Sequence, residues 1–425
     1  MVFIVIIVPL NFKYFYTMRI LHTADWHLGI KLHKKDLSED HKIFFEWLIN
    51  LIEEREIEVL LISGDIFDHS NPAPEARHLY YSFLRQLIHV KCKVVITAGN
   101  HDSSAVLNGP RAILAMLNID IAASIPTSID ESIIELKNKN GITECVVCAV
   151  PYLRDSDIRT SMENETYKNR VEQKFLGMKT YFETVVNYAL QKYGENIPVI
   201  LMGHLFTSGV TTSDSERDIQ RGGLEMFSAN DFPKNCKYIA LGHIHKPQRV
   251  GNSETIRYSG SPIPLSFSEK NDNKIVLELN VSDNCIQQVL IHEIPSARRL
   301  RRFSGSFKEV QASLSAFKND KKLKCFAELE IIEKDHDPSL TVNLHKFITE
   351  FKSEEVEILT YKFKFTNNTS NLYLLDAENK NIEDLTPKEI LLKKLETEDI
   401  EEGKRDLIIE AFDELLSEII ENDQR

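Results

Sequence analysis

Cysteine is scarce in this sequence, and the cysteines it has are scattered. Six occur among 425 residues, which favours free thiols in a reducing compartment over a disulfide framework. Cys145 and Cys148 have the spacing of half a zinc site, but no second pair accompanies them. They fall in a strand-like run, where positions three apart face opposite ways. We therefore expect two cysteines buried in the core.

Long apolar runs are also missing. The most apolar stretch, Met1 to Leu10, is too short to span a bilayer, and it lacks the basic start and the cleavage site of a signal peptide. The sequence therefore predicts a cytoplasmic protein with no membrane contact. Met18 directly precedes the first expected strand, Arg19 to Thr23. Our interpretation is that translation starts at Met18 and that residues 1–17 are a non-native extension.

An excess of positive charge, typical of general nucleic-acid binders, is absent. The chain has 64 acidic and 51 basic residues, a net charge of −13. Much of the imbalance lies between Ile382 and Arg425, with 15 acidic and 6 basic residues. This composition argues against tight DNA binding by this chain alone.

The apolar pattern that is present predicts α/β layers. Helices are expected at 40–56, 74–90, 110–117 and 168–193, and a hairpin with an Asn-Gly turn at 133–136 and 143–150. Strands at 274–280 and 287–294 close this part, and a boundary follows near Pro295. The length also indicates two or three domains.

The remainder divides into two segments. Alternating apolar residues at 325–332 and 359–365 predict a small α+β domain spanning 295–380. The acidic segment 381–425 is expected to be helical. One helix would start at Thr386-Pro387, with a capping threonine and proline at the first position. A second would run from Arg405 to Ile420.

Five apolar runs each end in side chains that can bind metal, where strands of an α/β sheet meet their loops. Asparagine offers a neutral oxygen, histidine a nitrogen or a proton, and aspartate a carboxylate. Any one of these motifs alone would be an ordinary turn. Together they predict a single site, with the following members in chain order: Asp25, His27, Asp65, Asn100, His101, Asp102, His204, His243 and His245.

The ordered set D-x-H, G-D, G-N-H-D, G-H, G-H-x-H resembles the calcineurin-like metallophosphoesterases. The resemblance implies a four-layer sandwich of two central sheets flanked by helices. It also implies two divalent ions. Asp25, His27 and His245 would bind one; Asn100, His204 and His243 would bind the other; Asp65 would bridge them. Histidine, aspartate and asparagine suit manganese, iron or zinc; the resemblance favours Mn²⁺, with Mg²⁺ or Fe²⁺ as alternatives.

The resemblance also assigns roles to neighbouring residues. His101 would act on the leaving oxygen as a catalytic residue that does not bind metal, and Asp102 would orient it. Asp68 is a candidate for supporting the ligands or the substrate. His69, which follows it, is a weaker candidate for substrate contact.

The flanks of these motifs resemble SbcD, the nuclease-subunit family of bacterial SbcCD complexes. They include Thr23 to Gly29, Gly242 to Pro247 and Tyr258 to Phe267. The resemblance implies a 3′→5′ exonuclease on duplex ends and an endonuclease on hairpins and single strands, in DNA repair, recombination and replication. It also implies an SbcC-type ABC ATPase as partner. The chain has no Gly-x-x-x-x-Gly-Lys-Ser/Thr loop of its own.

By the same resemblance, residues 18–294 form the nuclease domain, 295–380 a capping domain that guides DNA, and 381–425 the partner-binding segment. The chain would form a homodimer within a heterotetramer, with the helix at 74–90 as a candidate interface. Arg298 and Arg299 belong to a run of arginines with Arg301 and Arg302. This run would either contact DNA phosphate or be an ordinary solvated group of charges. The terminal helices would either dock on the partner or pack against the rest of this chain. The alternative function is a two-metal phosphodiesterase acting on nucleotides without a partner.

Overall fold

The computed structural model describes residues 16–158, 167–216, 227–335 and 337–366, with single helical positions between 388 and 415. The expectation about the N-terminal extension falls mostly on residues outside this range, as does the helix start at Thr386. Tyr16 is described. It packs against the cluster that contains Met18, and its hydroxyl donates to the Glu58 carboxylate.

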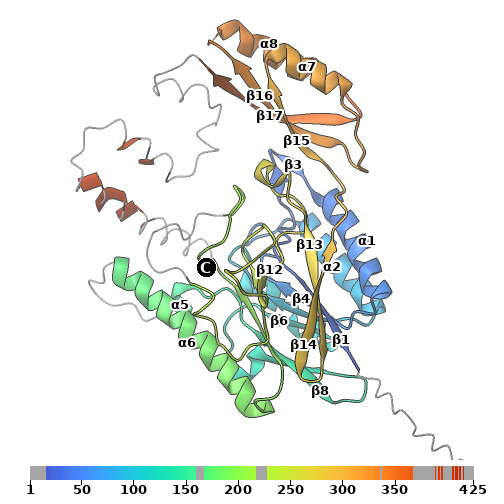
Figure 1. Cartoon of the computed structure of the whole chain (residues 1–425), viewed down its shortest axis with the longest axis vertical. Helices are drawn as coiled ribbons and strands as arrows, with labels where there is room; N and C mark the ends of the chain where they lie inside the picture. The colour runs from blue at the N-terminus through green and yellow to red at the C-terminus, as the bar shows by residue number, and fades with distance from the viewer. Residues whose placement is uncertain are drawn as a thin grey trace, which may run out of the picture.

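Two six-stranded sheets form the centre of the first domain (Figure 1). The strands of the first sheet are β1 (Met18–Thr23), β4 (Val59–Ser63), β5 (Lys93–Thr97), β6 (Ile119–Ala122), β13 (Ile275–Ser282) and β14 (Cys285–Glu293). Those of the second are β7 (Ile133–Lys137), β8 (Thr143–Ala149), β9 (Val199–His204), β10 (Tyr238–Gly242), β11 (Gln248–Arg249) and β12 (Ile256–Tyr258). The orders are β14-β13-β1-β4-β5-β6 and β11-β12-β10-β9-β8-β7.

Helices cover the outer face of each sheet. α1 (Ser38–Glu54) and α2 (Pro74–His89) share a core with the first sheet, and α6 (Tyr167–Tyr193) shares one with the second. A third cluster, with Ile20 and Leu61 from one sheet and Val147 and Met202 from the other, fills the space between the sheets. The expected four-layer α/β sandwich is therefore confirmed.

Short elements complete the domain: β2 (Lys31–Leu32), β3 (Lys35–Asp36), α3 (Ser104–Asn108), α4 (Arg111–Met116), α5 (Asp155–Ile158) and the 3₁₀ turns η1 (Ile129–Ser132) and η2 (Phe267–Glu269). The helices and strands expected from the sequence are present in this domain, with ends shifted by at most two residues. Cys145 and Cys148 are buried in clusters on opposite faces of β8, as predicted. Among the helices in the described part of the chain, none has the length and apolarity needed to cross a bilayer.

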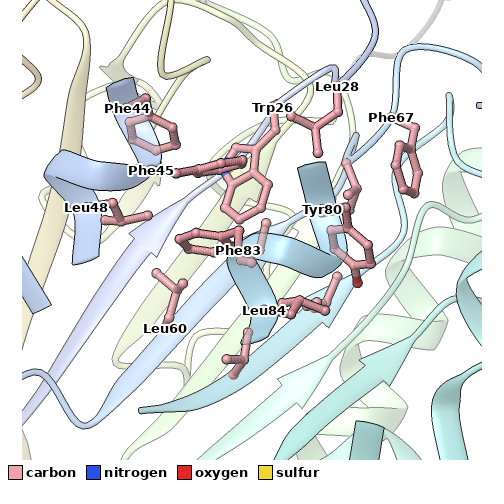
Figure 2. Packing of buried hydrophobic residues seen from close by; sticks show 14 of the residues in the cluster. Trp26, Leu28, Phe44, Phe45, Leu48, Leu60, Phe67, Tyr80, Phe83 and Leu84 are labelled. Carbon is pink, nitrogen blue, oxygen red and sulfur yellow. The ribbon is translucent and has the colours of Figure 1, made fainter. Parts of the chain in front are cut away.

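Trp26 anchors the first loop of the site to this core (Figure 2). Its indole is fully buried and packs edge-to-face with Phe45 of α1 and Phe83 of α2, at centroid distances of 5.0 and 5.3 Å. The ring nitrogen donates to Thr23 Oγ1 at 3.1 Å. Because Trp26 lies between Asp25 and His27 in the chain, its packing fixes the backbone that carries both.

The second domain is a three-stranded parallel sheet with two helices, at the top of Figure 1. Its elements are β15 (Leu300–Gly305), α7 (Phe307–Ala316), β16 (Cys325–Glu333), α8 (Pro338–Glu350) and β17 (Val356–Phe365). The helices and the sheet enclose a separate core that includes Phe303, Val310, Leu329 and Leu344.

Arg298 joins the two domains. Its guanidinium donates to both carboxylate oxygens of Asp40 on α1 at 2.9–3.1 Å and to the Lys324 carbonyl at 2.8 Å. It also lies over the ring of Phe326, 3.8 Å from the centroid. The paired side chains are only 10% and 6% exposed. A phosphate contact by Arg298 would therefore require breaking a buried ion pair.

We expect Arg298→Met to lower the free energy of unfolding by about 3–5 kcal/mol, because it leaves the Asp40 charge buried without its partner. Arg299→Met is the matched control, since the Arg299–Asp320 pair is exposed and worth about 0–1 kcal/mol. Urea unfolding of both variants makes the comparison. Equal stabilities of the two variants would contradict the role of Arg298 in joining the two domains. An Arg298→Met variant that is stable but binds DNA more weakly would instead favour a phosphate contact.

Candidate metal centre

The ends of five parallel strands deliver the candidate ligands to one place. β1 leads to Asp25 and His27, and β4 leads to Asp65. The remaining members lie at the end of β9 or follow β5 and β10: Asn100, His101, Asp102, His204, His243 and His245. All nine side chains are buried, none more than 7% exposed.

The loops hold several of these residues in an unusual backbone conformation. Asp25, His27 and Asp65 have φ of 54°, 48° and 50°, and His243 has φ of 104°. Such positions cost about 1–3 kcal/mol each and persist only where the surroundings fix them. Here the amide of Asp25 donates to the Gly64 carbonyl and that of His27 to the Asp65 carbonyl, both at 3.0 Å.

Two glycines of the motifs are required by close approach. A Cβ at Gly64, where φ is +85°, would lie 2.2 Å from His204 Nδ1. A Cβ at Gly99 would lie 2.1 Å from Asp65 Oδ1. The glycines therefore allow the loops after β4 and β5 to meet His204 at the end of β9.

The side chains form two groups around Asp65. In the first, ligand atoms of Asp25, His27 and His245 lie within 4.8 Å of one another, and the two Nε2 atoms are 3.1 Å apart. In the second, Asn100 Oδ1 is 3.0 Å from both His204 Nε2 and His243 Nδ1.

Asp65 lies between these groups. Its Oδ2 is 3.4 Å from His27 Nε2 in the first and 3.3 Å from His204 Nε2 in the second. The structure thus brings together all seven residues predicted to bind metal.

The donor set fits two divalent ions. Imidazole nitrogens with carboxylate and amide oxygens suit manganese, iron or zinc. Asp25 Oδ2 is buried and has no hydrogen-bond partner among the described residues. The Nε2 atoms of His27 and His245 converge on the same point in a region closed to solvent. Both features are expected of ligands that surround a cation.

The charges of the cluster shift the pKa values of its histidines. Burial alone would lower the pKa of His27, but the hydrogen bond to Asp68 and the charges of Asp65, Asp68 and Asp25 raise it to about 9. Burial likewise opposes protonation of His204, but Asp65 and Asp25 raise its pKa to about 9. The buried carboxylates therefore favour the protonated form of these two histidines.

Metal binding is expected to release about two protons per chain at pH 8, because ligand histidines must be neutral and His27 and His204 are protonated below about pH 9. Since protons compete with metal below that pH, affinity should rise from pH 7 to 9. Calorimetric Mn²⁺ titrations in buffers of different ionisation enthalpy measure the release. Binding heats that do not depend on the buffer would show that no protons are released, which would contradict protonated His27 and His204.

Asp68 contacts two histidines of the site. Its Oδ1 lies 3.2 Å from His27 Nδ1, which leaves Nε2 of His27 for the metal position. Its main-chain carbonyl lies 2.7 Å from His101 Nδ1. The Nδ1–H of His101 therefore donates to this carbonyl, which fixes the orientation of the imidazole ring.

Asp102 has a different position from the one predicted. The sequence assigns it to orient His101, but its carboxylate accepts backbone N–H groups of Ile66, Phe67 and Gly99 at 2.9–3.1 Å. Asp102 thus ties together the two loops that carry Asp65 and Asn100. Asp102 therefore acts through the backbone of these loops, and not through the imidazole of His101 as predicted.

The remaining candidates lie apart from the two metal groups. The His69 side chain is 69% exposed and lies 3.3 Å from Asp68 Oδ2. Arg298 is in the domain junction, and Arg299 pairs with Asp320. Among the contacts of the described residues, neither arginine reaches a predicted ligand.

Sequence reasoning missed the residues that hold His245. Glu216 Oε1 accepts the His245 amide at 2.8 Å, and Ser215 Oγ lies 2.6 Å from His245 Nδ1. Both come from a polar, acidic loop after β9. A cluster of serines and acids in that loop was the available signal, but nothing in the sequence connects it to His245.

Comparisons with known proteins identify a matching family and similar relatives. A family model for calcineurin-like phosphoesterases matches residues 18–247. The SbcD component of the SbcCD nuclease from Escherichia coli (strain K12) is 31% identical over 397 residues, 93% of this chain and 97% of that protein. The protein of that name from Rhodobacter capsulatus is 33% identical over 263 residues, 59% of this chain and 64% of its own. A solved dimetal phosphatase from Danio rerio covers 65% of this chain and 99% of its own, at 11% identity and a TM-score of 0.37.

Proposed function

The chain belongs to the calcineurin-like phosphoesterase family, among the relatives of the SbcD nucleases, and we propose that it is the nuclease subunit of a DNA-processing complex with an SbcC-type ATPase. It is a metal-dependent phosphodiester hydrolase by family. The proposal adds the substrates: duplex ends attacked 3′→5′, and hairpins and single strands cut internally. The observation that carries the two-metal chemistry is Asp65 Oδ2 between two groups of buried ligands, and the DNA substrates are supported by the similarity to the SbcD nucleases.

Two divalent ions, for which we propose Mn²⁺, would supply a clamp on the phosphodiester and a water of lowered pKa as nucleophile. Asp25, His27 and His245 would hold one ion and the Asn100, His204 and His243 set the other, with Asp65 shared. The strained, hydrogen-bonded loops keep these side chains in place before substrate arrives.

His101 is the proposed general acid. Its Nδ1–H is committed to the Asp68 carbonyl, so a proton on Nε2 is the one it can give to the leaving oxygen. Its amide also donates to Asp65 Oδ1 at 2.9 Å, which fixes the residue next to the proposed bridging ligand. Asp102 acts indirectly, by holding the loops of Asp65 and Asn100 together.

The other domains would bring DNA and partner to this centre. We propose that residues 295–380 form a capping domain that guides DNA, with Arg299 and His69 as the remaining candidates for substrate contact. The homodimer proposal is supported by Tyr81 and Ile88, which lie seven residues apart on α2 and are 40% and 36% exposed. The cytoplasm remains the proposed location.

Deleting Thr386 to Arg425 is expected to abolish binding of the ATPase partner and to leave metal-dependent hydrolysis of a small phosphodiester unchanged. The described helical positions in this segment include Leu407 and Leu415, which are 63% and 58% exposed and suited to docking on a partner helix. Size-exclusion chromatography of the mixed proteins measures the complex. A complex that survives the deletion would refute this role.

The function is tested by incubating the full chain with Mn²⁺ and a hairpin-ended duplex, with and without its candidate ATPase partner and ATP. We expect hairpin opening that requires the partner and ATP and stops when a chelator is added. Absence of DNA cleavage, together with rapid hydrolysis of an aryl phosphodiester, would contradict the nuclease proposal. It would favour the alternative, a phosphodiesterase that acts on nucleotides or small phosphodiesters.

A further inference from the structure

A buried polar network lies directly behind His245, outside the predicted set of ligands. Its centre is Glu269, which is fully buried, and Lys274, which is 5% exposed. Lys274 Nζ donates to Glu269 Oε2 at 2.5 Å, to Ser261 Oγ at 2.9 Å and to the His245 carbonyl at 3.0 Å. The ammonium thus has three acceptors, one of them the main chain of a candidate ligand.

Ser215 connects this network to the imidazole ring. Its Oγ lies 2.6 Å from His245 Nδ1 and also contacts Glu269 Oε1. Glu269, when ionised, only accepts, so the hydroxyl proton of Ser215 is directed to Glu269. The Ser215 oxygen is then the acceptor for an Nδ1–H of His245, and the lone pair of the neutral ring lies on Nε2.

The loop that carries Ser215 is held at several other points. Ser213 Oγ lies 3.2 Å from Glu269 Oε1 and 2.7 Å from Ser215 Oγ. The neighbouring Glu216 accepts the His245 amide. Both the ring and the backbone of His245 are therefore held by one short segment, which is itself anchored on Glu269.

We propose that Ser215, Glu269 and Lys274 are positioning residues for His245, setting its tautomer and ring orientation so that Nε2 faces the first metal position. The inference rests on the proposed function, since it takes His245 to be a ligand. It goes beyond that function because none of the three residues is part of the five ligand motifs D-x-H, G-D, G-N-H-D, G-H and G-H-x-H. A hydrogen bond to the second nitrogen of a metal-binding histidine commonly has this effect.

The test measures Mn²⁺ binding to the full chain, by equilibrium dialysis for affinity and stoichiometry and by electron paramagnetic resonance for coupling between two ions. Ser215→Ala removes the acceptor of His245 Nδ1, and Ser215→Thr keeps a hydroxyl. We expect Ser215→Ala to lower the affinity for one of the two Mn²⁺ ions by about 10–100-fold. The resonance signal of two coupled ions should decrease with it. The second ion should stay bound, and Ser215→Thr should bind the first ion with an affinity close to that of the wild type.

Glu269→Gln should behave like Ser215→Ala. Its matched control is Glu278→Gln, another fully buried carboxylate, which pairs with Arg55 and His292 away from the site. The control should keep both ions at wild-type affinity. Wild-type affinity in Ser215→Ala, or equal weakening in Glu278→Gln, would overturn the inference while leaving the proposed function intact. A wild-type chain that binds fewer than two ions would overturn both.

Discussion

Replacing His101 with alanine is expected to lower the rate of DNA hydrolysis by about 10²–10⁴-fold, the usual contribution of a general acid. Both metal ions should stay bound, because the side chain of His101 belongs to neither ligand group. The measurement is turnover of a hairpin-ended duplex with saturating Mn²⁺, alongside metal content by mass spectrometry.

His101→Asn separates proton transfer from orientation. Asparagine can still donate to the Asp68 carbonyl that holds His101 Nδ1, but it has no group equivalent to Nε2. If His101 delivers a proton, both variants lose DNA cleavage equally. They should also recover much of the rate on an aryl phosphodiester, whose weakly basic leaving group needs no proton. Restored DNA cleavage in His101→Asn would contradict the general-acid role.

Asp65→Ala is expected to abolish binding of both ions and to reduce hydrolysis to background. Its Oδ2 lies 3.4 Å from His27 Nε2 in the first group and 3.3 Å from His204 Nε2 in the second. Removing it takes a negative charge from a site whose other charged ligand is Asp25. Dialysis against Mn²⁺ followed by metal analysis checks the result.

Asp155→Asn is the control for Asp65→Ala. Asp155 is also a buried carboxylate, and it pairs with Arg170 and Lys174 outside the ligand groups. It should lose stability but keep both ions. Retention of one tightly bound ion by Asp65→Ala would contradict a shared ligand.

The place where the candidate ligands meet could be predicted from the sequence because its signals are local. Each strand and the ligands that follow it are contiguous, as in Val94 to Asn100. The arrangement of sheets then follows from the family pattern. The alternation around Cys145 and Cys148 was likewise enough to place them on opposite faces of a strand.

The contacts that the sequence did not reveal join residues far apart in the chain. Arg298 stands in a run of arginines, and only the fold brings Asp40, 258 positions away, to its guanidinium. Asp102 follows His101 directly, yet its carboxylate is taken by amides of the loop after β4. The role of a polar side chain depends on which donors the tertiary structure brings to it, and spacing alone does not give that.

The most direct test of the two-metal account is anomalous X-ray scattering at the manganese edge from crystals soaked in Mn²⁺. The account predicts two peaks on either side of Asp65, one against Asp25, His27 and His245 and the other against the Asn100, His204 and His243 set. A single peak, or two peaks that do not share Asp65, would contradict it.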